Sequence, residues 1–295
     1  MLNEGWFRIG HTTHLTEQSG CTAIIFDRMV PAAVDVRGGA PGTRETTLLD
    51  PGSLGMLDAI LLSGGSAFGL QAADGVMRYL AEQGRGVVTR GGEVPLVSSA
   101  IIFDLATGQR YHPTAQDGYA AAYDAEAGPW ASGLVGAGTG ATVSKLGGET
   151  TPGGFGIASV SLGAFSVTAA VVLNAVGDVR HPSTGDWLAR SSDKTGRQHA
   201  IAATAQGHEH ENTTIGAVLV TGDLDRRTLT RCCISAQAAL ARCTIPAHTL
   251  LDGDTFFAAS SGAGSPTVRE SLAITSAVEI AVEEAIISIF RSEGT

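Results

Sequence analysis

Clusters of glycine interrupt the apolar runs of this chain and constrain its fold more than any other feature. The sequence contains 39 glycines in 295 residues, well above the usual share of about 7%. Each cluster follows or precedes an apolar run of the kind that forms strands. Glycine permits positive φ angles and close backbone approach, so the pattern predicts many short strands that meet at tight turns around a common site. The clusters are Gly38-Gly39, Gly64-Gly65, Gly91-Gly92, Gly133 to Gly140, Gly147-Gly148 and Gly153-Gly154.

The composition predicts a soluble globular protein. Hydrophobic residues make up 43% of the chain, charged residues 16%, and the formal net charge is −10. This charge argues against nucleic acid or an anionic membrane as a partner. No apolar stretch is long enough to span a bilayer, and residues 1–14 lack a signal-peptide pattern, so we expect a cytoplasmic protein. The four cysteines form no CxxC pair and are expected to be reduced thiols, and we expect neither a metal nor a cofactor.

Apolar runs and turn signals predict layers of helices and strands. The expected strands are Cys21–Phe26, Ala32–Val36, Ala59–Leu62, Ala100–Asp104, Thr214–Thr221 and Thr255–Ser260, with a turn at Pro31 between the first two and two strands joined near Gly163 within Ile157–Leu173. The expected helices are Phe68–Gln83, capped by Ser66 and ended by Gly84, Asp225–Arg242 and Arg269–Arg291. Strands and helices occur in runs and not in strict alternation, which favours a layered arrangement over a doubly wound sheet.

Thr213 stands where a polar run meets an apolar, β-branched run. The polar run, Arg197 to Glu211, ends at Asn212, and the expected strand begins immediately after Thr213. A cut before Thr213 would leave a hydroxyl and a free amine on one residue, and the amine could act as the base for the hydroxyl. The alternative is an ordinary threonine at the start of a strand, where threonine is common.

Four other polar residues end or begin apolar runs and could surround this hydroxyl. Lys145 follows the glycine-rich segment Gly136 to Gly140, which lacks the spacing of a phosphate-binding loop, and could orient a substrate. Asn174 closes an apolar run and is a candidate oxyanion donor, although asparagine is also common in turns. Asp252 and Asp254 precede a strand and could orient the amine or hydroxyl of a nucleophile, or simply form a turn.

Eight stretches of the chain, in order, resemble peptidase family S58. This family of self-cleaving enzymes includes L-aminopeptidase/D-esterases, β-peptidyl aminopeptidases and 6-aminohexanoate (nylon) oligomer hydrolases. Each stretch alone is a weak signal, but eight in the family's order, from about residue 10 to residue 260, are specific. The stretches are Gly10-His-Thr with Gly20-Cys-Thr, Val34-Asp-Val-Arg-Gly-Gly39, Leu61-Leu-Ser-Gly-Gly-Ser66, Val97-Ser-Ser-Ala-Ile-Ile-Phe-Asp104, Gly136 to Lys145, Val172-Leu-Asn174, Asn212-Thr-Thr-Ile215 and Asp252-Gly-Asp-Thr255.

The resemblance implies an α/β fold, a four-layer α-β-β-α sandwich similar to the N-terminal-nucleophile (Ntn) hydrolases but with different strand connectivity. It also implies one self-processing domain, residues 1–295, that cuts itself between Asn212 and Thr213. The products would be an α chain of residues 1–212 and a β chain of residues 213–295. We further expect a homo-oligomer, a tetramer of processed αβ units.

The resemblance also places the family's site residues on this chain. They fall on Thr213 as nucleophile, Lys145, Asn174, Asp252 and Asp254. Asp252 matches the nylon-hydrolase-like branch, because the aminopeptidase branches tend to have serine there. Some members have a tyrosine where this chain has Phe68, so a hydroxyl contact to the nucleophile or substrate is missing here.

The implied activity is hydrolysis of amide bonds in small peptides or amino-acid amides through an acyl-enzyme. Endo-type hydrolysis of 6-aminohexanoate oligomers is an alternative, favoured by Thr213 and the two aspartates. Acyl transfer to an amine, as in ornithine acetyltransferases, is a related alternative that would use the nucleophile in a similar way. An uncleaved, non-catalytic binding protein of the same fold is the alternative from a different class.

Overall fold

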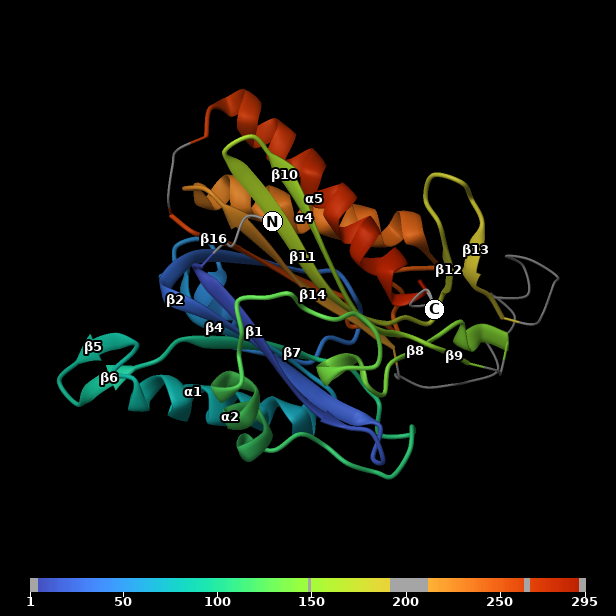
Figure 1. Cartoon of the computed structure of the whole chain (residues 1–295), viewed down its shortest axis with the longest axis horizontal. Coiled ribbons are helices and arrows are strands. Elements are labelled where there is room, and N and C mark those ends of the chain that lie inside the picture. Colours follow the sequence, from blue (N-terminus) through green and yellow to red (C-terminus); the bar gives the residue numbers. More distant parts are fainter. Residues whose placement is uncertain (1–4, 148–149, 192–211, 263–265, 292–295) are drawn as a thin grey trace.

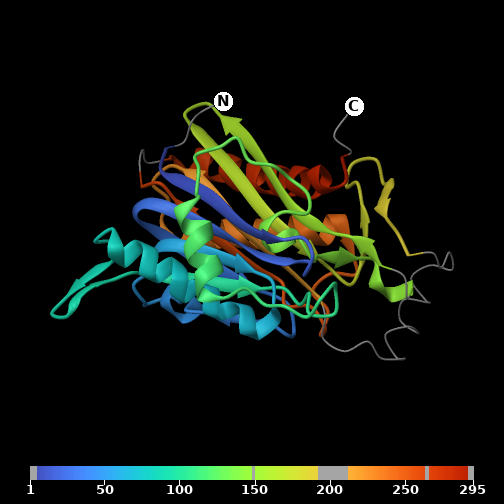
Figure 2. The ribbon, with the colours of Figure 1, turned by 60° about the horizontal axis from the view of Figure 1, so that its bottom comes forward.

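The structure is a computed structural model that describes residues 5–147, 150–191, 212–262 and 266–291. The polar run Arg197 to Glu211 lies outside these residues. Helices α4 (Arg226–Cys243) and α5 (Val268–Ile289) cover one side of two strand layers, and α1 (Ala72–Glu82) and α2 (Ala115–Tyr123) cover the other side (Figures 1 and 2). The expected α-β-β-α sandwich is therefore confirmed.

The two strand layers are parts of one nine-stranded hydrogen-bonded network. Smaller ladders join β12 (Asp178–Arg180) to β13 (Trp187–Ala189) and β15 (Thr244–Ile245), β5 (Val87–Thr89) to β6 (Gly92–Val94), and β8 (Thr142–Val143) to β9 (Thr151–Pro152). The large network runs in the order β10 (Gly154–Leu162), β11 (Phe165–Asn174), β14 (Thr213–Thr221), β16 (Thr255–Ser260), β2 (Ser19–Val36), β4 (Met56–Ser63), β7 (Val97–Ile101) and β3 (Thr43–Arg44), and β1 (Phe7–His14) also pairs with β2.

Strand β2 connects the two layers. Its first half pairs with β1 and β4, and residues 32–36 pair with β16. The expected turn at Pro31 was wrong, because β2 is one strand of 18 residues whose pairing with β4 becomes irregular between Ile25 and Val30. Proline removes one backbone donor, but partners on both sides of Pro31 keep the backbone extended. The long strand therefore passes from one layer to the other.

Each pair of adjacent layers encloses its own hydrophobic cluster. Val278 of α5 packs in the cluster between α4, α5 and the strands, and Phe257 in the cluster between the two strand layers. Leu80 of α1 packs in the third cluster, on the opposite side of the sandwich. Burial of apolar surface is the main driving force for such layers. The four cysteines are free and buried, in agreement with the prediction of reduced thiols.

Two further expected elements differ from the structure. The predicted helix Phe68–Gln83 begins as a 3₁₀ helix, η2 (Ser66–Gln71), and becomes α-helical only at Ala72. Ser66 does not cap it, because its φ angle of 53° is incompatible with the extended conformation of a helix N-cap. The strand expected at Ala100–Asp104 is β7, which ends at Ile101, where its pairing with β4 stops.

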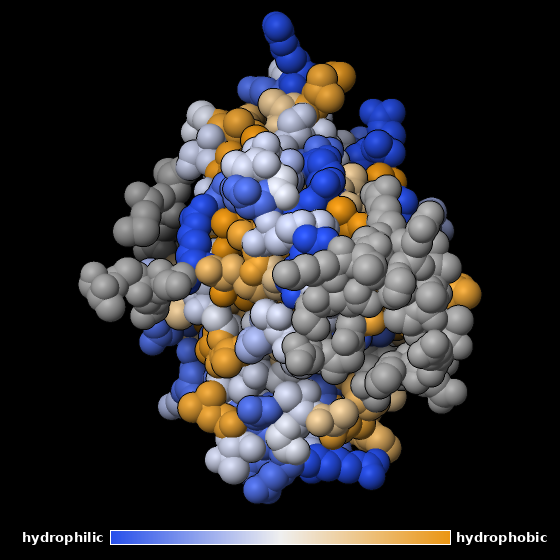
Figure 3. Space-filling view, turned by 90° about the vertical axis from the view of Figure 1, so that its right-hand side faces the viewer, coloured by the Kyte–Doolittle hydropathy of each residue, from blue (hydrophilic) through white to orange (hydrophobic). Residues whose placement is uncertain are grey.

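The C-terminal half agrees closely with the sequence analysis. Gly163 has a φ angle of 61° and forms the turn between β10 and β11. Asp225 caps α4 through a hydrogen bond from Thr228 N, and β16 has the expected bounds. None of the described helices is long and apolar enough to cross a membrane. The face shown in Figure 3 mixes hydrophilic and hydrophobic residues.

Candidate active site

The predicted site residues meet where β11 ends and β14 begins. Asn174, the last residue of β11, is the direct cross-strand partner of Thr213, the first residue of β14. Asn212 forms an isolated parallel bridge with Asp252. Thr213 is only 3% exposed. The sheet register thus brings together residues that lie about 40 positions apart in the chain.

The carbonyl of Asn212 accepts two hydrogen bonds. Gly253 N donates to Asn212 O over 3.1 Å, and Thr213 Oγ1 donates to the same oxygen. A Cβ atom at position 253 would lie 2.8 Å from Thr213 Oγ1 and 2.7 Å from Ala40 O, so only glycine fits without a shift of its neighbours. Gly253 was not among the site residues predicted from the sequence, although its position between two aspartates of the predicted site could have indicated it.

Asp254 holds the start of β14. Its Oδ1 atom accepts a hydrogen bond of 2.7 Å from Thr214 N. Its Oδ2 atom accepts a hydrogen bond of 3.0 Å from His248 N and lies 2.8 Å from His248 Nδ1. Asp254 therefore acts on Thr213 through the next residue of the strand. His248 was missed by the sequence analysis, because a single histidine on a loop carries no distinguishing pattern.

Asp252 organises the turn that precedes β16. Its Oδ2 atom accepts hydrogen bonds from Thr249 N and Thr249 Oγ1, at 2.9 and 2.6 Å. Burial and then the nearby charge of Asp254 raise the pKa of Asp252 to about 6. A Cβ atom at Gly38 would lie 2.2 Å from Asp252 O, which explains why a glycine-containing stretch packs against this turn. Asp252 thus stabilises the turn that carries Gly253.

Lys145 and Asn174 form a pair beside Thr213. Lys145 Nζ donates to Asn174 Oδ1 over 3.0 Å and to Asn174 O over 3.3 Å. Thr142 N also donates to Asn174 Oδ1, over 2.9 Å, and Asn174 Nδ2 donates to Phe103 O over 3.2 Å. The side-chain amide of Asn174 is therefore fixed by hydrogen bonds to Thr142 N, Phe103 O and the ammonium group of Lys145.

Asp104, next to Phe103, is a buried carboxyl group near this pair. Its Oδ1 atom accepts a hydrogen bond of 2.6 Å from Gly65 N. A Cβ atom at Gly64 would lie 2.1 Å from Asp104 Oδ2. Burial outweighs the hydrogen bonds and the charge of Lys145, and raises the pKa of Asp104 to about 6. Compared with the unfolded chain, the folded protein therefore keeps the proton on Asp104 to a higher pH.

This pKa predicts a pH-dependent benefit of Asp104→Asn. Between about pH 4 and pH 6 the folded state binds a proton at Asp104 that the unfolded state has lost, so wild-type stability falls as pH rises through this window. The amide cannot titrate, and the stability of the variant relative to wild type should increase by up to about 3 kcal/mol between pH 4 and pH 7. Urea unfolding at several pH values measures the difference, with the exposed Asp27→Asn as control. A difference that does not vary with pH would contradict this account.

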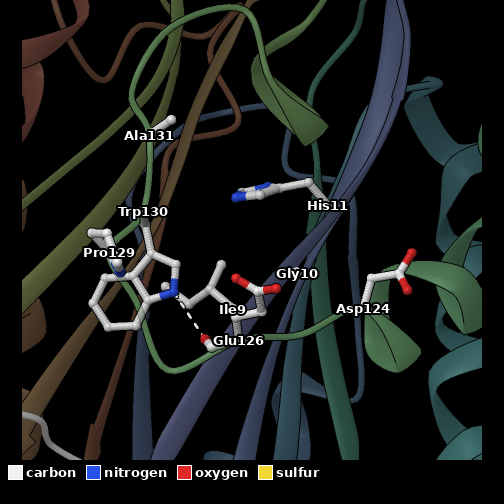
Figure 4. Close-up of a pocket in the computed structure, with 8 residues that line it drawn as sticks. All are labelled: Ile9, Gly10, His11, Asp124, Glu126, Pro129, Trp130 and Ala131. Atoms are coloured by element: carbon white, nitrogen blue, oxygen red, sulfur yellow. Dashed lines mark hydrogen bonds between the residues drawn. The ribbon is translucent and has the colours of Figure 1, made fainter.

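A cavity of about 240 Å³ lies elsewhere, between β1 and the segment around Trp130. None of the predicted catalytic residues lines this cavity, in which the His11 ring faces Trp130 (Figure 4). Burial lowers the pKa of His11 to about 4, so the ring is neutral at pH 7. His11 Nδ1 lies 2.9 Å from Thr22 Oγ1.

No group of three or more histidine, cysteine, aspartate or glutamate residues within the described part of the chain is arranged to hold a metal ion.

The four-layer architecture defines the class of protein, an Ntn-hydrolase-like fold. It aligns with an L-aminopeptidase D-Ala-esterase/amidase from Ochrobactrum anthropi, described as a variant of the Ntn-hydrolase fold, with a TM-score of 0.73 and 19% identity. It also aligns with a β-aminopeptidase from Burkholderia sp., with a TM-score of 0.72 and 21% identity. Each alignment covers 96% of this chain and 83% of the other. At these identities the likeness establishes the fold alone.

The chain belongs to peptidase family S58, whose profile matches residues 7–293. It is 45% identical over 278 residues to an uncharacterized aminopeptidase of Mycobacterium leprae, covering 88% of this chain and 75% of the relative. It is 31% identical over 263 residues to a 6-aminohexanoate-oligomer endohydrolase of Kocuria sp., covering 85% and 71%. The protein is therefore a hydrolase that acts on peptide or amide bonds.

Proposed function

We propose that this protein is an N-terminal-threonine hydrolase that activates itself by cutting its chain between Asn212 and Thr213. The main support is the Asn212 carbonyl, which lies between the Thr213 hydroxyl and the N–H of Gly253. Thr213 Oγ1 attacks the carbonyl carbon, the peptide C–N bond breaks, and the nitrogen takes up a proton as the free amine. Water then hydrolyses the resulting ester. Gly253 N stabilises the negative charge that develops on the oxygen.

After the cut, the same hydroxyl attacks amide substrates. The free α-amine of Thr213 has an unperturbed pKa near 8 and can serve as general base. Asn174, beside Thr213 on the neighbouring strand, stabilises the oxyanion of the acyl-enzyme pathway. Lys145 orients Asn174, and Asp254 with Asp252 aligns the strand that carries the nucleophile. The processed protein consists of residues 1–212 and 213–295 and assembles as a homo-oligomer.

We propose small peptides or amino-acid amides as substrates, and linear 6-aminohexanoate oligomers as the second candidate. The names of the mycobacterial and Kocuria relatives support these two classes respectively. Phe68 is 55% exposed and stacks on His112 with 5.3 Å between the ring centroids. An aromatic face without a hydroxyl thus replaces the tyrosine of some members.

A denaturing gel of the purified protein tests this function. Two bands, at about two-thirds and one-third of the chain mass, are expected from the position of the cut. One full-length band would instead support an uncleaved binding protein. Initial rates on amino-acid p-nitroanilides, β-peptides and aminohexanoate oligomers would then separate the two substrate classes.

Gly253→Ala is expected to slow self-cleavage by about 10²-fold. The new methyl group meets Thr213 Oγ1 and Ala40 O at distances that force a shift, and the N–H at position 253 then moves away from the Asn212 carbonyl. Losing one oxyanion donor typically costs a factor of 10² to 10³. Cell-free synthesis followed by gel analysis gives the rate. Gly91→Ala is the matched control, since its Cβ would come no closer than 3.8 Å to Thr89 Oγ1. Equal cleavage of the two variants would exclude this role for Gly253.

A further inference from the structure

His248 occupies an unusual backbone conformation next to the nucleophile strand. Its φ angle is 56°, in the left-handed region that most residues other than glycine avoid. Such a conformation persists only where the surroundings hold it. Here it brings two donors of one residue, the backbone N–H and ring Nδ1, to the same Asp254 Oδ2 atom. The left-handed conformation of His248 thus lets both donors reach the same carboxylate oxygen of Asp254.

The ring of His248 lies between two hydrogen-bond acceptors, which favours its protonated form. Nδ1 lies 2.8 Å from the Asp254 carboxylate, and Nε2 lies 3.3 Å from the backbone carbonyl of Gln237 in α4. Both neighbours are acceptors, and a neutral imidazole can donate to only one of them. Burial opposes protonation, but the hydrogen bond to Asp254 and the charges of Asp254 and Asp252 outweigh it and raise the pKa of His248. The imidazolium form satisfies every contact.

The contacts of Asp254 connect His248 to the cleavage point. The Asp254 side chain is 2% exposed, and its two oxygens face in different directions, Oδ2 toward His248 and Oδ1 toward Thr214 N. Without the donors at Oδ2, the carboxylate can rotate away from Thr214 N. The amide of Thr214 follows Thr213 directly, so this bond sets where the Thr213 hydroxyl lies relative to the Asn212 carbonyl.

We propose that His248 is a positioning residue for self-cleavage, which fixes the Asp254 carboxylate so that Thr213 Oγ1 stays aligned with the Asn212 carbonyl. The inference rests on the proposed function, in which Thr213 is the nucleophile. His248 touches neither the hydroxyl nor the carbonyl in the hydrogen bonds of the described residues. Its effect passes through Asp254 and the start of β14.

Two substitutions distinguish the contribution of the His248 side chain from that of its backbone conformation. Glycine and asparagine both tolerate a positive φ angle, so His248→Gly and His248→Asn keep the turn. Only asparagine places a side-chain N–H near the position of Nδ1. We expect His248→Asn to cleave itself within about threefold of the wild-type rate, and His248→Gly about 10²-fold more slowly, since a misplacement of about 1 Å can cost that much.

Amide exchange supplies a readout that does not depend on cleavage. In a Thr213→Ala background, His248→Gly should speed exchange of the Thr214 amide at least tenfold, while His248→Asn should not. The Leu219 amide, in the second half of β14, should exchange equally in both and thus controls for general destabilisation.

The possible results separate the two proposals. Equal cleavage rates and equal Thr214 exchange in the glycine and asparagine variants would overturn the role of His248, while an uncut Thr213→Ala chain would leave the proposed function standing. A normal cut in Thr213→Ala alone would refute the proposed function. A wild-type chain that stays at full length would refute both.

Discussion

Thr213→Ala is expected to stay at full length and to hydrolyse no amide substrate. Both self-cleavage and turnover use the same hydroxyl, so its removal stops both, and the loss of kcat should be of the order of 10⁶, as for other removed nucleophiles. Intact-mass analysis and initial rates measure the two effects. Thr213→Ser should keep partial processing, because a primary hydroxyl still attacks but rotates more freely than the β-branched threonine side chain.

Thr214→Val is the matched control for the nucleophile. The Thr214 hydroxyl is buried and has no hydrogen-bond partner among the described residues, so an isosteric methyl group replaces it at little cost. The backbone bond from Thr214 N to Asp254 remains in the variant. We expect a normal cut before Thr213. If this variant stopped processing while Thr213→Ala was still cut, the neighbouring threonine would be the nucleophile.

Asn174→Ala should lower kcat of the processed enzyme by 10²- to 10³-fold, the usual effect of removing one oxyanion donor. The structure adds a cost that the sequence did not suggest. The truncation leaves Thr142 N and Phe103 O without the side-chain partner they have in the wild type. Both hydrogen bonds are partly buried, so folding stability should fall as well, by up to about 1–3 kcal/mol for each unpaired group. Steady-state kinetics and urea unfolding, with the cut confirmed by mass, measure both effects.

Val172→Ala is the control that distinguishes a loss of folding stability from a loss of kcat. Val172 lies two residues earlier in β11 and is fully buried between the strand layers. Its truncation should destabilise the protein by about 2 kcal/mol through the cavity it leaves, with kcat nearly unchanged. If Asn174→Ala kept a kcat as high as that of Val172→Ala, Asn174 would be a structural residue only.

Several features of the fold followed from short stretches of sequence. The turn at Gly163, the helix expected from Asp225 to Arg242 and the strand Thr255–Ser260 each depend on neighbours within a few positions, and all three agree with the structure to within one residue. Ser66 failed as a cap because its positive φ angle is set by the turn that joins β4 to η2, which a short stretch does not reveal.

The order of eight short motifs was enough to predict the family, the four-layer fold and a set of polar residues near Asn212. Those motifs indicated which residues gather, because Asn174 ends β11, Thr213 begins β14 and Asp254 directly precedes β16. Only the tertiary structure decided how they touch. The register of β11 against β14 pairs Asn174 with Thr213. The close packing at Gly253 directs its N–H to the Asn212 carbonyl. The left-handed backbone conformation of His248 brings its ring to Asp254. The physical reason is that local patterns specify backbone periodicity, whereas hydrogen bonds between distant segments depend on sheet register and packing over the whole chain.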